Sequence, residues 1–145
     1  MKPEKITFKT RLILINNYST LLIGQTRING GQYTLIGGNV DAGETATQSL
    51  VRECYEEAGL IIREEHLKLV HVRQKIKGKS HKVTLYFQGL KWEGNIRPKE
   101  KDKFTSVAWY PIDQLPLNIK PTTKQVLQAI NKGQLFATAR QTINI

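Results

Sequence analysis

The sequence has little cysteine, little acid and no long apolar segment. Cys54 is the one cysteine among 145 residues, so an internal disulfide is excluded and a reducing cytoplasm is the expected compartment. No apolar run approaches the roughly 20 residues that a membrane-spanning helix needs. Charged residues interrupt positions 1–11 and exclude a signal peptide there. These absences favour a globular protein that works without a membrane partner.

The length and composition predict one folded domain over residues 1–145. The chain is 39% hydrophobic and 23% charged, which is typical of globular domains with room for a core. No repeat, low-complexity tract or linker divides it. Whether the protein is a monomer or a homodimer is left open by the sequence.

The few acids are concentrated in one segment, residues 38–60. The chain has 22 bases and 12 acids, and this segment holds five of the acids and one base, Arg52. The segment therefore carries −4, and the other 21 bases and seven acids give the rest of the chain +14. A basic frame around an acidic centre suits a polyanionic ligand held through a metal. The alternative is that the basic surface only aids solubility.

Residues 46–58 are predicted to form a helix with marked ends. Thr45 followed by Gln48 is a capping-box pattern, and Gly59 favours a left-handed turn that stops the helix. At about 100° per residue, Glu53, Glu56 and Glu57 share one arc. A separate arc is predicted to face the core; it contains Thr47, Leu50, Val51, Cys54 and Ala58.

Three neighbouring carboxylates repel one another by a few tenths of a kcal/mol per pair on an exposed helix. Hard divalent cations such as Mg²⁺ or Mn²⁺ remove that cost because they prefer oxygen ligands. The Gly37-Gly38 pair lets the backbone pass close to these side chains. A solvated acidic helix face is the alternative, and the spacing alone does not decide between the two.

Apolar and alternating runs predict the remaining elements. Strands are expected at residues 6–16, 20–26, 33–36, 67–77, 82–90 and 104–112, and a second helix at 122–131. Residues 134–145 give weak signals and fit a strand, a docking segment or disorder equally. The order of strands, helix, strands and helix favours a mixed sheet between helices.

The acidic segment resembles the Nudix box, and the chain is similar to small, single-domain, MutT-like Nudix hydrolases. Pro usually precedes the Gly-Gly pair in this family, whereas Ile36 stands there in this chain, which affects the rigidity of the turn more than the chemistry. Every fixed position of the box is filled, by Gly38, Glu44, Arg52, Glu53, Glu56, Glu57 and Gly59.

The resemblance implies an α/β/α sandwich with a mixed β-sheet and a divalent metal site. It implies that Mg²⁺ or Mn²⁺ is held by Glu53, Glu56, Glu57 and the Gly38 carbonyl. Glu53 is the expected proton acceptor, and Glu44 is expected to assist. Among the remaining fixed residues, Arg52 is expected to form an ion pair with Glu44, and Gly59 is expected to be structural.

The resemblance also suggests residues that contact the substrate or complete the site. Arg27 and the Gly37 backbone are candidates for phosphate contacts, and Tyr33 is a candidate for stacking on a base. Many relatives have a further carboxylate on a late loop, where Glu100 or Asp102 could serve. Lysines near residues 75–82 could guide a polyphosphate or form a solvated edge.

The implied activity is hydrolysis of a nucleoside diphosphate-linked substrate. A nucleoside triphosphate, including oxidised forms, would give the monophosphate and pyrophosphate. ADP-ribose, dinucleoside polyphosphates and RNA 5′ ends are alternatives, although no recognition helix or zinc-finger spacing supports RNA. A nucleotide-sensing module without catalysis is a further alternative, which the intact box disfavours.

Overall fold

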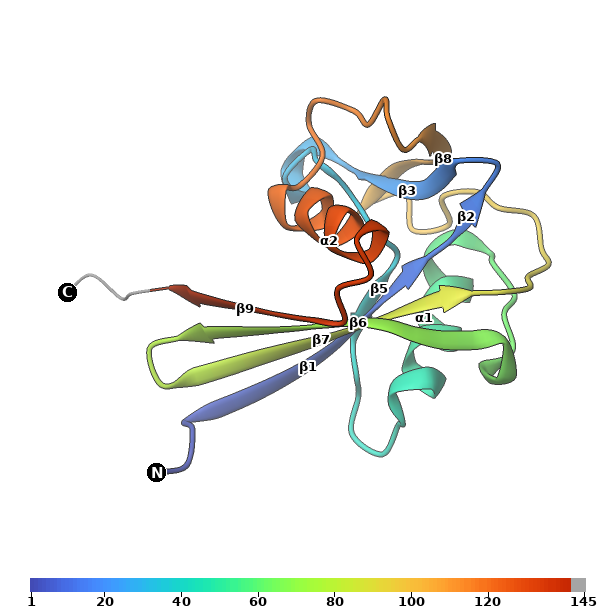
Figure 1. The fold of residues 1–145 in the computed structure, drawn as a ribbon. Helices are drawn as coiled ribbons and strands as arrows, with labels where there is room; N and C mark the ends of the chain where they lie inside the picture. Colours follow the sequence, from blue (N-terminus) through green and yellow to red (C-terminus); the bar gives the residue numbers. More distant parts are fainter. Residues whose placement is uncertain (142–145) are drawn as a thin grey trace.

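The computed structural model describes residues 1–141, in which a five-stranded mixed sheet is the larger of two sheets (Figure 1). The strand order is β5-β1-β7-β6-β9. β1 pairs in parallel with β7, and β6 pairs in parallel with β9, while the other pairs are antiparallel. The strands are β1 (Lys5–Ile13), β5 (Gly37–Asn39), β6 (Leu67–Lys77), β7 (Ser80–Gly89) and β9 (Phe136–Gln141).

The smaller sheet is built around β3 (Ser19–Gln25). It pairs with β8 (Phe104–Pro111) along its whole length, and with β2 (Ile15–Asn16) and β4 (Tyr33–Thr34) at its two ends. The strand predicted at 6–16 is therefore two strands in different sheets. Buried Leu14 lies between them, and Asn17 and Tyr18 have φ of 49° and 60° in the tight turn into β3.

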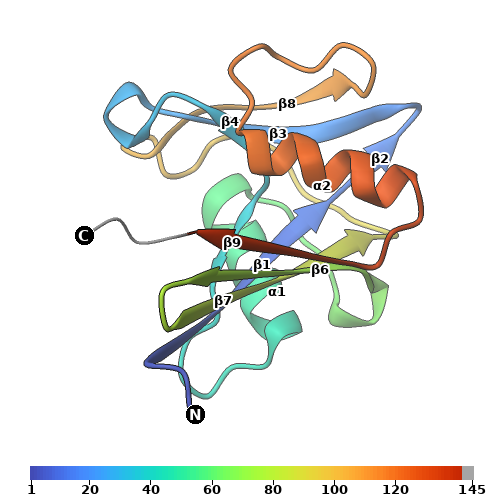
Figure 2. The ribbon, with the colours of Figure 1, turned by 60° about the vertical axis from the view of Figure 1, so that its left-hand side comes forward.

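Two helices lie on opposite sides of the sheets, α1 (Ala46–Ala58) and α2 (Pro121–Asn131) (Figure 2). Consecutive residues of a strand face opposite sides. Leu12 packs in the core beneath α1, whereas its neighbour Ile13 packs in the core beneath α2. The predicted α/β/α sandwich is confirmed, with each sheet contributing to both cores.

Short elements complete the described chain. 3-10 turns occupy Arg27–Asn29 and Glu64–His66. Of the alternatives for residues 134–145, the strand is found, as β9, which ends at Gln141. Residues 142–145 lie outside the described residues. In the described part, no helix is long and apolar enough to cross a membrane.

The ends of α1 follow the predicted pattern. The Gln48 N–H donates to Thr45 Oγ1 at 3.2 Å, and the Thr45 N–H donates to Gln48 Oε1 at 3.0 Å. Gly59 has φ 66° and its N–H donates to the carbonyls of Cys54 and Tyr55. Cys54 is fully buried, as the predicted core arc required.

The Gly37-Gly38 pair lies in strand β5, and its backbone passes close to Glu53 and Glu57, as the sequence suggested. Gly37 and Gly38 pair with Arg11 and Thr10 of β1. Gly37 has φ 150°, and a Cβ there would collide with the Thr10 carbonyl. This close pairing holds the backbone of β5 in place beside α1.

We predict that Gly37→Ala destabilises the protein by more than about 1 kcal/mol, because both the dihedral angle and the Thr10 collision oppose a side chain. Gly43→Ala is the matched control, since Gly43 has φ 83° but no atom within 4 Å of a built Cβ. Urea unfolding of both variants measures the difference. Equal losses would show that the close approach to Thr10 has no cost.

Candidate active site

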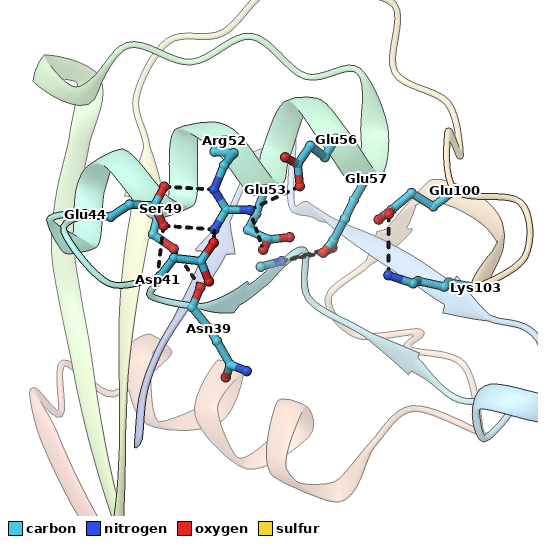
Figure 3. A network of polar contacts seen from close by, with 11 residues as sticks. Asn39, Asp41, Glu44, Ser49, Arg52, Glu53, Glu56, Glu57, Glu100 and Lys103 are labelled. Atoms are coloured by element: carbon cyan, nitrogen blue, oxygen red, sulfur yellow. Dashed lines mark hydrogen bonds and ion pairs between the residues drawn. The ribbon is translucent and has the colours of Figure 1, made fainter. Parts of the chain in front are cut away.

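The Arg52 guanidinium lies at the centre of the acidic segment (Figure 3). It contacts Glu44 through two hydrogen bonds, of 2.8 and 3.0 Å. It also reaches Glu53 at 3.0 Å, Glu56 at 3.1 Å and Asp41 at 3.2 Å. One cation therefore offsets the repulsion within what we call the carboxylate cluster, which is Asp41, Glu44, Glu53, Glu56 and Glu57.

Glu44 connects the loop before α1 to this cluster. Its Oε1 accepts from the Asp41 N–H at 3.0 Å. Hydrogen bonding to Arg52 is the main reason that the pKa of Glu44 is lowered. Glu44 is thus held as a carboxylate and fixes the position of Arg52.

Glu57 is the buried member of the cluster. It is 3% exposed, and the Gly37 N–H donates to its Oε1 at 3.2 Å and to its Oε2 at 3.4 Å. Burial, followed by the charge of Glu53, raises the pKa of Glu57 to about 8. Because its surroundings disfavour the negative charge of this carboxylate, a nearby cation would stabilise the ionised form.

Glu53 lies directly against the second glycine. A Cβ built on Gly38 would lie 2.7 Å from Glu53 Oε1, so only glycine leaves room for this carboxylate beside the backbone. Burial raises the pKa of Glu53 above its ordinary value, although Arg52 acts in the opposite direction. A raised pKa makes this carboxylate a better proton acceptor.

The side chains of α1 supply oxygen donors that fit a hard divalent cation. Arg52 uses Oε1 of Glu53 and Oε2 of Glu56, which leaves the second oxygen of each carboxylate to another ligand. Within residues 1–141, however, no three His, Cys, Asp or Glu side chains already converge as a metal site requires. The donors are adjacent, and Arg52 occupies the space on one side of them.

The late loop places one of its two candidate acids beside the cluster. The N–H groups of Arg97 and Lys99 donate to the carbonyls of Ala58 and Glu57, which fixes the loop to the end of α1. The charge of Glu100 contributes to the raised pKa values of Glu53 and Glu57. Glu100 also pairs with Lys103 at 3.5 Å, whereas the exposed Asp102 does not form an ion pair among the described residues.

A basic cleft of about 160 Å³ opens on the α2 side of the five-stranded sheet. Arg11 lines it and donates to the Leu35 carbonyl at 3.4 Å. Arg11 also pairs with Gly37 across the sheet, so the cleft adjoins the backbone that holds Glu57. Among the described residues no acid lines this cleft, and its six cations are Lys9, Arg11, Arg73, Lys75, Lys82 and Lys120.

The cations of the cleft repel one another, which adds to the effect of burial in lowering the pKa values of Lys9 and Lys120. Burial and then the charges of Arg11, Lys82 and Lys120 lower the pKa of Lys9 to about 8. The pKa of Lys120 is lowered by burial and by Arg11. Bound phosphate groups would relieve this repulsion. Lys9, Arg11 and Lys120 were not predicted as site residues from the sequence, although the even spacing of Lys5, Lys9 and Arg11 indicates that they share one face of a strand.

Two predicted substrate residues are not brought to the cluster by any contact in the described chain. Arg27 is exposed in a 3-10 turn. Tyr33 packs edge-on against Tyr110, with ring centroids 5.2 Å apart, while its neighbour Thr34 lines the basic cleft. The roles of Arg27 and Tyr33 stay predictions.

Comparison with known proteins gives a consistent family assignment. A family profile described as the NUDIX domain matches residues 8–130. The chain is 34% identical over 97 residues to the NAD-capped RNA hydrolase NudC of Photorhabdus laumondii, covering 67% of this chain and 36% of that protein. It is 28% identical over 110 residues to the oxidized purine nucleoside triphosphate hydrolase of Danio rerio, covering 74% and 68% respectively.

Solved structures of similar proteins share the fold. The MutT NUDIX hydrolase of Burkholderia pseudomallei matches with a TM-score of 0.77 and 25% identity, over 86% of this chain and 98% of that chain. The MutT protein of Bacillus halodurans matches with a TM-score of 0.75 and 20% identity, over 94% and 90%. Among the curated relatives, the chain spans between 36% and 42% of the NudC proteins.

We predict that Glu57→Gln changes how stability depends on pH in the metal-free protein. The folded-state pKa of Glu57 is raised from 4.5 to about 8. Between these values the folded state keeps a proton that the unfolded state has lost, so wild-type stability falls as pH rises. The fall approaches about 1.4 kcal/mol per pH unit, and Gln removes it.

Urea unfolding with a chelator at several pH values between 5 and 8 measures this effect. The stability of Glu57→Gln relative to wild type should increase with pH. Glu93→Gln removes one exposed carboxylate and is the matched control. Parallel pH profiles for Glu57→Gln and wild type would contradict the assignment of a destabilised carboxyl to Glu57.

Proposed function

The chain belongs to the Nudix family, and we propose that it hydrolyses a phosphoanhydride bond in a nucleoside diphosphate-linked substrate with Mg²⁺ or Mn²⁺. The observation that carries this proposal is one juxtaposition. Glu53 and Glu57 lie against Gly38 and Gly37, and the basic cleft begins on the neighbouring strand at Arg11. Carboxylates that could bind a metal ion therefore lie next to basic side chains that could bind phosphates.

Glu53, Glu56, Glu57 and the Gly38 carbonyl would hold the metal ion. When bound, the ion neutralises phosphate charge and lowers the pKa of the attacking water. Glu44 is not among these ligands; it orients Arg52 through two hydrogen bonds. Arg52 in turn positions Glu53 and Glu56, so the side chains of α1 are arranged before substrate binds.

Glu53 is the proposed proton acceptor for the attacking water. The water oxygen forms a bond to one phosphorus, and the bond from that phosphorus to the bridging oxygen breaks. The water proton passes to the Glu53 carboxylate, and the electron pair of the broken bond stays on the leaving phosphate. Glu53 suits this role because burial raises its pKa and because its carboxylate lies against the backbone of Gly38, whose carbonyl is a proposed metal ligand.

A nucleoside triphosphate, including oxidised forms, is the leading substrate, with the monophosphate and pyrophosphate as products. The name of the Danio rerio relative, an oxidized purine nucleoside triphosphate hydrolase, supports it. Lys9, Arg11 and Lys120 in the cleft would contact its phosphates. ADP-ribose and dinucleoside polyphosphates contain the same bond and belong in the same test.

An RNA 5′ end is the second candidate substrate. The first four curated relatives are named NAD-capped RNA hydrolases, and the six cations of the cleft suit a longer polyanion. The chemistry required of Glu53 is the same for both candidates. They differ in how much of the basic surface the substrate covers.

A panel of nucleotides incubated with Mg²⁺ or Mn²⁺ tests the activity. We expect a nucleoside triphosphate to yield a monophosphate and pyrophosphate, with ADP-ribose, dinucleoside polyphosphates and 5′-triphosphorylated or NAD-capped RNA measured alongside. Pyrophosphate, phosphate and AMP are the products to assay. Tight nucleotide binding without any product across the panel would instead support a sensing module.

We predict that Glu53→Gln lowers kcat by at least about 100-fold, because the variant loses the proton acceptor. The fold should survive, since Gln can still accept from Arg52 Nη1. Glu93→Gln is the control for removal of an exposed carboxylate and should retain kcat. Near-normal turnover by folded Glu53→Gln would place the proton acceptor at another residue.

A further inference from the structure

One face of the five-stranded sheet carries a row of cations that leads away from the basic cleft. Side chains two residues apart on a strand share a face, and residues paired across strands share it too. Lys5 and Lys77 both pair with Ser80, and Arg73 and Lys9 both pair with Thr84. The seven cations of this basic face are Lys5, Lys9, Arg11, Arg73, Lys75, Lys77 and Lys82.

Helix α2 covers one end of this face and leaves the other open. Ile13 and Tyr86 lie under α2 in its core, and Arg11 is two residues before Ile13 on the same side. Towards the other end, Lys5 and Lys77 are exposed. The outer ends of β1, β6 and β7 extend past α2 in both views (Figures 1 and 2).

The charges on the basic face are not neutralised by other residues among positions 1–141. None of its seven cations forms an ion pair in the part of the chain that the structure describes. The paired rows contribute threonine, serine, tyrosine and histidine, but no acid. Burial and the charges of Lys75 and Arg11 lower the pKa of Lys82. A polyanion lying on this face would lower the electrostatic free energy.

The basic face is longer than a nucleoside triphosphate requires. Arg11 and Lys5 are six residues apart on β1, which corresponds to about 20 Å of strand. The near end is Arg11, next to Gly37 and therefore next to Glu57. Phosphates bound at the carboxylate cluster would occupy only this end, and a continuing chain of phosphates could reach Lys5 and Lys77.

We propose that the basic face binds the sugar–phosphate backbone of a single-stranded RNA whose 5′ end lies at the carboxylate cluster. This inference rests on the proposed function and names the substrate class that the same site takes. The face presents Lys, Arg, Ser and Thr side chains, and it lacks exposed aromatic rings within the rows described above. Binding therefore depends on phosphates and is independent of base sequence.

A double variant at the far end, Lys5→Gln/Lys77→Gln, tests the proposal. The probe is a 5′-triphosphorylated, 3′-fluorescent oligoribonucleotide of about 12 nucleotides, a length within the range of single-strand sites. Fluorescence anisotropy without divalent metal gives Kd at several salt concentrations. We expect Kd to rise on the order of tenfold near 0.1 M salt, and the slope of log Kd against log salt to fall by about 1.4.

The matched control is Lys91→Gln/Lys132→Gln, which removes the same charge at exposed lysines outside the basic face. It should leave Kd and the salt slope unchanged. A triphosphorylated trinucleotide should bind wild type and the far-end variant equally, because it ends before Lys5 and Lys77. Hydrolysis of a nucleoside triphosphate should also be the same in both proteins.

Equal weakening by the two double variants would overturn the proposal, because net charge alone would then explain binding. Equal affinity of wild type for the trinucleotide and the longer RNA would overturn it as well. The binding arms do not require turnover. Absence of hydrolysis with every nucleotide would therefore refute the proposed function, while length-dependent binding at Lys5 and Lys77 would still support an RNA-binding face.

Discussion

The arrangement of the site depends on holding mutually repelling carboxylates together beside a backbone that passes unusually close. Arg52 provides the counter-charge for four of them, and the Gly37 N–H holds the fifth, Glu57. Neither partner fully compensates, since the pKa values of Glu53 and Glu57 remain raised by burial. A divalent cation would remove the remaining electrostatic cost, and we propose that the carboxylates of α1 are its ligands.

The same strand pairing links this acidic site to the basic surface. β5 pairs with β1: the Gly37 N–H donates to Glu57, and Arg11, the cross-strand partner of Gly37, lines the basic cleft. Side chains on β1 alternate between an apolar face towards α1 and a cationic face towards α2. Because the two charge types meet at one pair of residues, a substrate with several phosphates can contact both without a change in the fold.

Local features were predictable from the sequence, and features that depend on strand register were not. The bounds of α1, its capping box, the Gly59 stop and the burial of Cys54 follow from patterns within 15 residues. The division of residues 6–16 between two sheets does not, because it depends on pairing with β7 and β3. The basic face was not predictable for the same reason. Lys5 and Lys77 lie on the same row of the sheet only because both strands pair with Ser80 of β7. The burial of Glu57 depends on its contact with β5. The helical spacing of Glu53, Glu56 and Glu57 does not distinguish it from the other two.

The most direct test of this account is Mn²⁺ uptake followed by electron paramagnetic resonance. Wild-type protein should remove the signal of free Mn²⁺, and uptake should strengthen as pH rises from 6 to 8, because Glu57 must lose its proton to bind metal. A folded variant with Gln at positions 53, 56 and 57 should not bind Mn²⁺ at any of these pH values. Equal uptake by the variant and the wild type would show that these carboxylates do not form the metal site.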